Sequence, residues 1–242
     1  MGTTLYLIRH GETEGSEEKR YKGTIDVPLS ERGIRQMEEA SRYIVELSRN
    51  RSDSPLPRDN PPTSPLRAMA FSKGGQRGII KGGMGGLFDA VYCSDLSRAV
   101  RGAEIIAKPF RLSPVKINGL RERDFGVWEG MSFDEIKEKY PEDFRAWVRN
   151  PLRFSPTGGE NTLEVKERCM NAIDRVVDTH NGENIAVVAH GGVNRIILCQ
   201  FLGIPLENIF RIEQDYGAVN IVEFHSSYPV VKLFNYKPYD YV

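Results

Sequence analysis

Residues 5–13 have the sequence LYLIRHGET, in which an apolar run is followed by Arg9, His10 and a glycine. Residues 185–192, IAVVAHGG, repeat this arrangement and place His190 after a second apolar run. Each run has the composition of a buried strand, and the glycine permits a sharp turn and a close approach of a ligand to the backbone. A single histidine at a strand end is usually structural. Two histidines in the same local setting indicate a functional site.

Strands and helices alternate outward from these two segments. Apolar periodicity predicts helices at 30–47, 97–107, 162–179 and 193–202, with shorter ones at 132–140 and 142–148. Strands are expected at 4–8, 89–93, 115–117, 185–189, 209–212, 219–224 and 230–234. This alternation predicts an α/β fold, a three-layer α/β/α sandwich around a mostly parallel sheet with an antiparallel edge near the C-terminus. The length of 242 residues fits a single domain, 1–242.

Residues 49–88 interrupt this pattern with five prolines, a glycine-rich stretch and an excess of basic residues. The glycine-rich part lacks the Gly-Lys-Ser/Thr of a phosphate-binding loop and does not join a strand to a helix, which argues against a nucleotide site. A loop of this length is usually functional or disordered. We expect a mobile insertion at the amino ends of the strands, away from the two histidines.

The overall charge gives no argument for a nucleic-acid or membrane partner, because 33 Lys and Arg balance 33 Asp and Glu. The apolar runs are shorter than the roughly 20 residues of a membrane helix. Cys93, Cys169 and Cys199 are odd in number and widely spaced, so we expect reduced core thiols in a cytoplasmic protein and no metal site. The oligomeric state stays open, with a homodimer as one alternative.

Polar groups with a common chemistry follow four of the predicted strands. Arg9 and His10 follow the first, residues 94–99 (SDLSRA) follow the second, residues 120–130 (LRERDFGVWEG) come after the third, and His190 ends a later one. Ligands of parallel α/β sheets bind beyond the carboxyl ends of the strands, so these groups are expected in one crevice.

This mixture of side chains suits phosphoryl transfer. Arginine forks neutralise a phosphate monoester, and a neutral imidazole can accept the phosphoryl group and so divide hydrolysis into two easier steps. A second imidazole can donate to the phosphoryl oxygens, and a carboxylic acid can protonate the departing alkoxide and later activate water. Since the cationic side chains supply the positive charge, no metal or other cofactor is expected.

The motifs RHGET (9–13), SDLSRA (94–99) and LRERDFGVWEG (120–130) together resemble those of the histidine phosphatase superfamily, whose fold is called phosphoglycerate mutase-like. The resemblance covers about 1–47 and 89–236. It implies that His10 is the nucleophile, that Arg9 and Arg98 bind phosphate, that His190 completes the pocket and that Glu122 is the acid/base.

Residues near these motifs have alternative interpretations. Many relatives have Trp-Asn where this chain has Gly15-Ser16; the Ser16 hydroxyl is expected to contact phosphate in place of the asparagine, as is Gly191 after the second histidine. Glu129 is the alternative acid, better suited to capping the next helix. The remaining candidates are expected to be structural or exposed: Glu12 orienting the first turn, Arg121 and Arg123 in surface ion pairs, His180 and His225 exposed and inert.

The segment 125–160 is expected to form the cap over the leaving group. Its sequence resembles the short caps of α-ribazole-5′-phosphate phosphatase and broad-specificity phosphatases, whereas cofactor-dependent phosphoglycerate mutases carry a longer, more basic insertion there. This favours a metal-independent phosphomonoesterase acting on a small phosphorylated metabolite. A 2,3-bisphosphoglycerate-dependent mutase is the alternative. A non-catalytic phospho-ligand module is less favoured, since the candidate catalytic side chains are all present.

Overall fold

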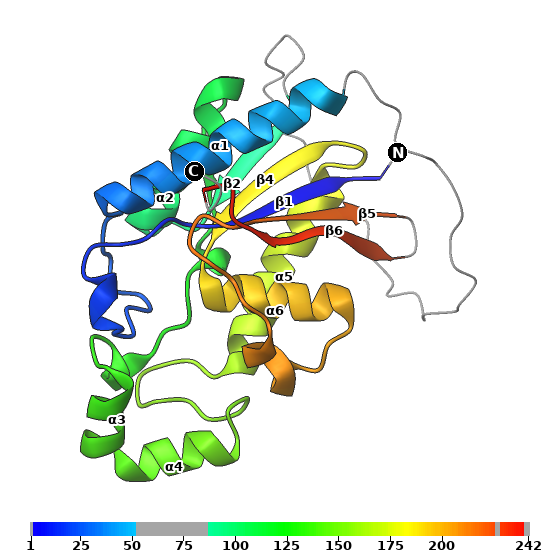
Figure 1. Ribbon diagram of the computed structural model, residues 1–242. Helices are drawn as coiled ribbons and strands as arrows, with labels where there is room; N and C mark the ends of the chain where they lie inside the picture. The colour runs from blue at the N-terminus through cyan, green and yellow to red at the C-terminus, as the bar shows by residue number, and fades with distance from the viewer. Residues whose placement is uncertain (1, 52–86, 226–227, 240–242) are drawn as a thin grey trace.

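The computed structural model describes residues 2–51, 87–225 and 228–239. Its centre is a sheet with the strand order β3-β2-β4-β1-β5-β6 (Figure 1). Strands β3, β2, β4 and β1 are parallel, whereas β5 runs antiparallel to β1 and β6 antiparallel to β5. This confirms the predicted mostly parallel sheet with an antiparallel C-terminal edge. The strands are β1 (Thr4–Arg9), β2 (Ala90–Cys93), β3 (Val115–Lys116), β4 (Asn184–Ala189), β5 (Val219–Phe224) and β6 (Pro229–Tyr236).

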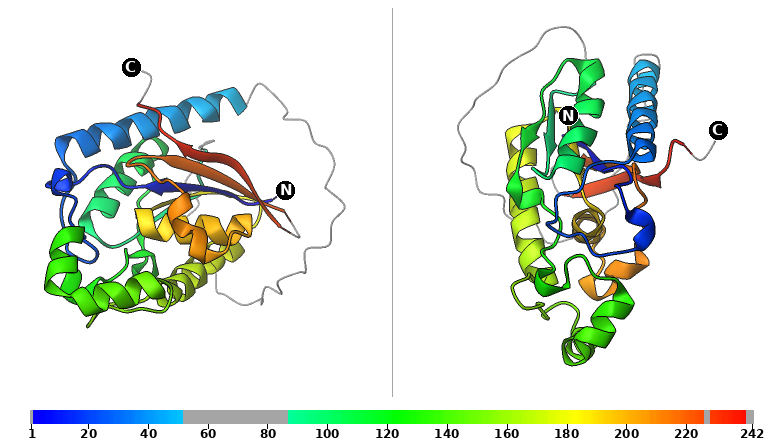
Figure 2. Two further views of the ribbon diagram at one scale, coloured as in Figure 1. Left: turned by 60° about the horizontal axis from the view of Figure 1, so that its bottom comes forward. Right: turned by 90° about the vertical axis from the view of Figure 1, so that its left-hand side faces the viewer.

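Helices cover both faces of this sheet, as Figures 1 and 2 show. On one face lie α1 (Glu31–Arg51) and α2 (Ser97–Ala107), and on the other α5 (Thr162–Thr179) and α6 (Gly191–Leu202). Two short helices, α3 (Phe133–Lys139) and α4 (Pro141–Arg149), extend the molecule beyond the carboxyl ends of the parallel strands. The 3-10 turns are η1 (Ser16–Glu18), η2 (Lys108–Phe110), η3 (Asn118–Leu120), η4 (Gly126–Trp128) and η5 (Leu206–Arg211).

The central strand β1 shows how the sequence builds three layers. Successive side chains of a strand point to opposite faces of its sheet. Leu5 and Leu7 are fully buried against α5 and α6, while Tyr6 and Ile8 are fully buried in the cluster of α1 and α2. An uninterrupted apolar run is therefore what a strand covered on both faces requires.

Local signals in the sequence place several helix ends. Asn161 and Glu164 form a capping box at the start of α5, and Ser132 and Glu135 form one at the start of α3. At the start of α1 the Ser30 hydroxyl accepts a hydrogen bond from the Gly33 amide at 3.0 Å. The helix continues beyond the predicted end at 47, as far as Arg51.

The predicted strand at 209–212 is wrong, because this segment lies in the 3-10 turn η5 and the residue after it. Leu206, Ile209 and Ile212 are buried, whereas Phe210 is 67% exposed. Burial at every third residue is the period of a 3-10 helix, while a strand would bury every second one.

The expectation that His180 is exposed and inert is also wrong. Its ring is buried, with Nδ1 2.6 Å from a Glu183 carboxylate oxygen and Nε2 2.7 Å from the Tyr92 hydroxyl. This side chain connects the end of α5 to β2. It lies toward the amino ends of the strands, away from the two strand-end histidines. His225, by contrast, is exposed as expected.

Most of the predicted insertion at 49–88, namely 52–86, lies outside the described residues. Its two ends belong to the folded domain and not to the predicted insertion. Residues 49–51 are part of α1, and Leu87 and Phe88 are buried in the core beside α1 and α2. All three cysteines are buried free thiols. Within the described part of the chain, no helix has the length and apolarity needed to cross a bilayer.

Candidate active site

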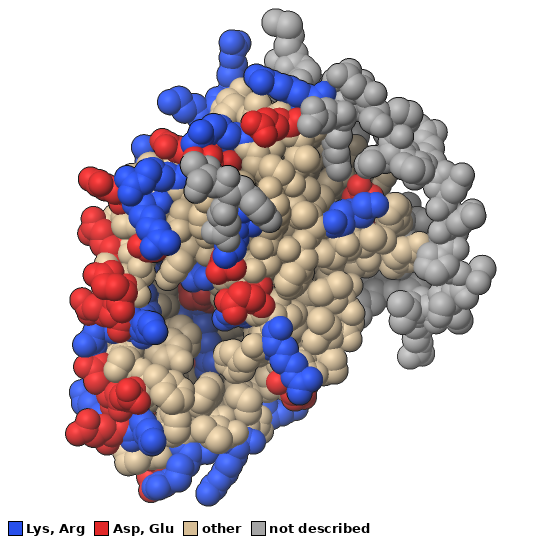
Figure 3. All heavy atoms as spheres, in the orientation of Figure 1, with Lys and Arg blue, Asp and Glu red and all other residues tan. Residues whose placement is uncertain are grey.

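The four strand ends meet at a pocket of about 530 Å³. In Figure 3 it is a hollow with Lys and Arg atoms at its floor. Six of the residues singled out in the sequence line it: Arg9, His10, Ser16, Arg98, Glu122 and Gly191. His190 lies behind this wall, fully buried, with its ring centroid 5.0 Å from that of His10. The expected crevice is therefore present in the structure.

His10 directly follows β1 and is held as one tautomer of its neutral ring. Its Nδ1 lies 2.7 Å from the Gly11 carbonyl oxygen, and because a carbonyl can only accept, Nδ1 carries the proton. Burial, together with the charges of Arg98 and Arg9, holds the pKa of His10 well below its usual value. The ring thus keeps a free lone pair on Nε2 at neutral pH.

His190 directly follows β4 and is the N-cap residue of α6. Burial and the neighbouring His10 hold its pKa well below the ordinary histidine value, with Arg98 and Arg9 acting in the same direction. Neither ring nitrogen has a hydrogen-bond partner, although both are shielded from solvent. A buried polar atom without a partner is costly, which marks this ring as one prepared for a ligand.

Arg9 is fixed at the floor by the loop that precedes β5. Its Nη1 donates to the Gln214 carbonyl oxygen, and its guanidinium carbon lies 3.8 Å from the ring centroid of Tyr216. The Nε atom is buried without a partner and is therefore available to an anion. A Cβ on Gly191 would lie 3.1 Å from this Nε, so the glycine leaves room for the guanidinium.

Arg98 reaches the same floor from the first turn of α2. It is almost completely buried and donates to the Ile25 and Gly23 carbonyl oxygens at 2.8 and 2.6 Å. Burial lowers the pKa of Arg98, and Glu122 is the first of the carboxylates that oppose this shift. These contacts fix the guanidinium toward the two histidines.

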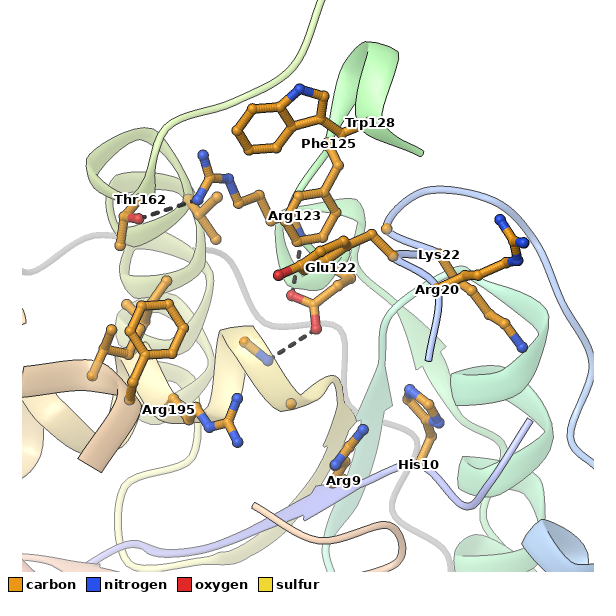
Figure 4. Close-up of a pocket in the computed structure, with 18 of the residues that line it drawn as sticks. Arg9, His10, Arg20, Lys22, Glu122, Arg123, Phe125, Trp128, Thr162 and Arg195 are labelled. Carbon is orange, nitrogen blue, oxygen red and sulfur yellow. Dashed lines mark hydrogen bonds between the residues drawn. The ribbon is translucent and has the colours of Figure 1, made fainter. Parts of the chain in front are cut away.

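Glu122 lies between the floor and the mouth of the pocket (Figure 4). Its Oε1 accepts from the Arg123 amide and its Oε2 from the Gly192 amide, both at 2.9 Å. A Cβ on Gly192 would lie 2.5 Å from Oε1. The second glycine after His190 therefore allows the carboxylate to approach the start of α6.

A network of charges holds the segment that carries Glu122. Arg168 of α5 donates to the backbone carbonyls of Gly119, Arg121 and Glu122, and it pairs with Glu160 at 2.7 Å. Glu160 in turn accepts from the Asp124 amide. The position of the carboxylate thus depends on Arg168 of α5.

The neighbouring candidates have structural partners. Glu129 accepts from the Thr24 amide and hydroxyl and the Ile25 amide, so it fastens the loop before α1 and does not cap a helix. Arg121 is exposed and pairs with Asp95 at 2.6 Å, as expected. The expectation that Arg123 forms a surface ion pair is corrected by the structure. Arg123 lines the pocket, and its guanidinium donates to the carbonyls of Glu160 and Phe154.

Several residues that line the pocket were not identified in the sequence. Lys22 contacts the Thr13 hydroxyl at 3.2 Å, and its charge contributes to the low pKa of His10. Tyr216 stacks on Arg9, and Arg195 lies one turn after Gly192 on α6. The spacing from Gly192 was the only signal in the sequence for Arg195. The remaining wall is mostly aromatic or apolar: Tyr21, Phe125, Trp128, Trp147, Val165, Ile196, Ile209 and Phe210.

Known proteins are similar to this chain over most of its length. Phosphoserine phosphatase 1 of Hydrogenobacter thermophilus is 29% identical over 96% of this chain and 91% of its own length. The metal-independent phosphoserine phosphatase of Arabidopsis thaliana is 30% identical over 81% of this chain and 67% of its own. The crystal structure of the alpha-ribazole phosphatase from Shigella flexneri superposes with a TM-score of 0.75 at 24% identity, covering 97% of this chain and 96% of that one.

The family model of the histidine phosphatase superfamily, branch 1, matches residues 5–59 and 84–237. The matched residues include both strand-end histidines, both arginines of the floor and Glu122. With the sheet, the paired histidines and the sequence match in agreement, this chain belongs to branch 1 of the histidine phosphatase superfamily.

Proposed function

We propose that this protein is a phosphoric monoester hydrolase that transfers the phosphoryl group of a small metabolite to His10 and then to water. The observation that carries the proposal is the neutral His10 ring, whose Nδ1 proton is committed to the Gly11 carbonyl while the second nitrogen stays free among arginines. A neutral imidazole is the nucleophile that phosphoryl transfer requires.

In the first step the Nε2 lone pair of His10 forms the N–P bond while the P–O bond to the alcohol breaks. Arg9, Arg98 and His190 bind the phosphoryl oxygens and stabilise the charge that develops on them. Glu122, protonated in this step, gives its proton to the departing alkoxide. The arginines and Lys22 supply the positive charge that metal-dependent phosphatases obtain from an ion.

In the second step water attacks the phosphohistidine, and Glu122, now a carboxylate, takes the proton of that water. The P–N bond breaks, inorganic phosphate leaves, and the neutral His10 ring is restored. Ser16 and Gly191 at the wall are proposed as further phosphate contacts. The segment 125–160 is proposed as the cap over the alcohol, since η4 and α4 contribute Trp128 and Trp147 to the pocket.

The two relatives favour hydrolysis over the mutase alternative, since both are phosphatases. The substrate class that these names suggest for this chain is a small phosphorylated metabolite. We also propose a cytoplasmic location, where small phosphorylated metabolites are available as substrates.

The test is a phosphate-release assay over a panel of monoesters, with 2,3-bisphosphoglycerate-dependent mutase activity on 3-phosphoglycerate measured in parallel. We expect release of phosphate and no mutase activity. His10→Ala is expected to abolish both turnover and the acid-labile labelling of the protein by ³²P-labelled substrate. Labelling that persists in His10→Ala would refute the assignment of the nucleophile, and mutase turnover exceeding phosphate release would refute the hydrolase.

A further inference from the structure

The pocket has two ends of different chemistry. In Figure 4 Arg9 and His10 lie at one end, Phe125 and Trp128 at the other, and Glu122 between them. The first end accounts for the phosphate group. The second end faces the alcohol of the ester, and nothing in the proposed chemistry explains its composition.

Aromatic side chains from separate parts of the chain form this second end. Trp147 of α4 and Phe210 of η5 meet edge to face, with ring centroids 6.3 Å apart and planes at 73°. Trp128 is fixed by stacking on Phe154 at 5.3 Å. The aromatic wall is therefore assembled from the proposed cap and from the body of the domain, across the mouth of the pocket.

Phe210 is 67% exposed although it lines the pocket. A phenylalanine ring left in water forgoes the stabilisation that its burial would give. A ligand ring placed against Phe210 and Trp147 would recover part of that burial. Aromatic pairs add specificity to it through edge-to-face or offset contacts.

The charges at the pocket argue against an amine in the substrate. Glu122 is the one carboxylate among the described residues that line it, and both of its oxygens already accept backbone hydrogen bonds. An ammonium group would therefore find a single carboxylate, that of Glu122, on a wall whose charged side chains are otherwise cationic. The other charged side chains of the wall are all cationic: Arg9, Lys19, Arg20, Lys22, Arg98, Arg123 and Arg195.

The size of the pocket agrees with a larger alcohol. Pockets of roughly 300–1,000 Å³ hold drug-sized ligands, and this one measures about 530 Å³.

We propose that the enzyme selects monoesters whose alcohol carries an uncharged aromatic ring, and that Phe210 and Trp147 determine this specificity by binding the ring. This inference rests on the proposed hydrolase function.

The test compares monoesters of primary alcohols, and its main pair, a naphthyl-substituted ethyl ester and ethyl phosphate, differs little in leaving-group acidity. We expect kcat/KM for 2-(2-naphthyl)ethyl phosphate to exceed that for ethyl phosphate by about tenfold or more. O-phosphoethanolamine, which adds an ammonium to the ethyl ester, is expected to be a poorer substrate than ethyl phosphate.

Phe210→Ala is expected to lower kcat/KM for the naphthyl ester about fivefold more than for ethyl phosphate, with most of the loss in KM. Trp147→Leu should act in the same direction. Phe234→Ala is the matched control, because Phe234 is 41% exposed on β6 and does not line the pocket; it should leave the ratio of the two esters unchanged.

Equal turnover of the naphthyl and ethyl esters, or a ratio unaffected by Phe210→Ala and Trp147→Leu, would overturn the inference and leave the hydrolase intact. A preference for phosphoethanolamine would overturn it as well. Absence of turnover on every ester would instead refute the proposed function, and the inference with it.

Discussion

Two uncharged imidazoles, those of His10 and His190, lie against each other at the floor of the pocket among cationic side chains. This arrangement is favourable only while both rings stay neutral. Protonating either ring costs free energy in the native state. The same histidines protonate freely in the unfolded chain, so acid lowers the free energy of unfolding.

We therefore expect the free energy of unfolding to fall as the pH drops below the ordinary histidine pKa of about 6.5. The native rings have lower pKa values than the unfolded ones, so below this pH the unfolded state binds protons that the native state does not. The expected loss between pH 7 and 5.5 is about 1 kcal/mol for each histidine, measured by urea denaturation. A His10→Asn/His190→Asn double variant should show a shallower dependence; identical slopes would contradict the pKa assignment.

Glu122 offers a second prediction for a single residue. Glu122→Gln is expected to slow esters of poorly acidic alcohols by about a hundredfold or more, since their alkoxides need a proton, and to spare p-nitrophenyl phosphate, whose leaving group is stable without one. Rates on both ester types give the comparison. Equal losses on the two would assign Glu122 another role.

The secondary-structure elements explain why the site has its shape. Arg9 and His10 come from the end of β1, Arg98 from α2, Glu122 from the segment held by α5, and His190 from the junction of β4 and α6. The helices were predictable because their apolar period is regular over many residues, and β1 and β4 because each is an uninterrupted apolar run. The family motifs then identified the polar side chains at the ends of these elements.

The rest of the site could not be predicted, because its contacts form only in the folded chain. Tyr216 stacks on Arg9 from a loop that has no periodic pattern, and Arg123 was indistinguishable from the surface residue Arg121 beside it. The segment 209–212 resembled a strand because short apolar runs do not distinguish a period of two from a period of three. His180 is buried by Tyr92, a partner from a distant element.

The end of α1 and the start of β2 lead to a prediction for residues 52–86, the segment that joins them. Arg51 and Leu87 lie near the amino ends of the strands, whereas His10 lies at the carboxyl end of β1 (Figure 1). Replacing 52–86 with a short Gly/Ser linker is expected to leave kcat/KM on a small ester within about threefold. A folded variant that lost a hundredfold or more would show that this topological argument is wrong.

At the scale of the whole molecule, the charge is distributed unevenly. The chain has equal numbers of acidic and basic residues, yet the wall of the pocket is cationic with Glu122 as its described carboxylate. A dianionic ester is attracted to such a site by fixed side chains. The protein thus carries at the pocket the charge that its reaction needs.

Because these cations are part of the chain, activity is expected to be unchanged after dialysis against EDTA and after addition of Mg²⁺ or Zn²⁺. The rate of phosphate release before and after treatment is the measurement. Arg98→Ala is the companion variant, expected to lose activity by about a hundredfold or more because one fixed charge is removed. Activity restored only by a divalent ion would refute the metal-independent mechanism.

The central position of β1 has a consequence for how the protein is made. This strand leaves the ribosome well before both of its neighbours, β4 at 184–189 and β5 at 219–224. At synthesis rates of roughly 5–20 residues per second, its apolar run waits on the order of ten seconds or more without a pairing partner. Nascent chains of this enzyme should therefore be clients of chaperones that shield apolar segments, and they should gain activity only once β4 and β5 have emerged from the ribosome.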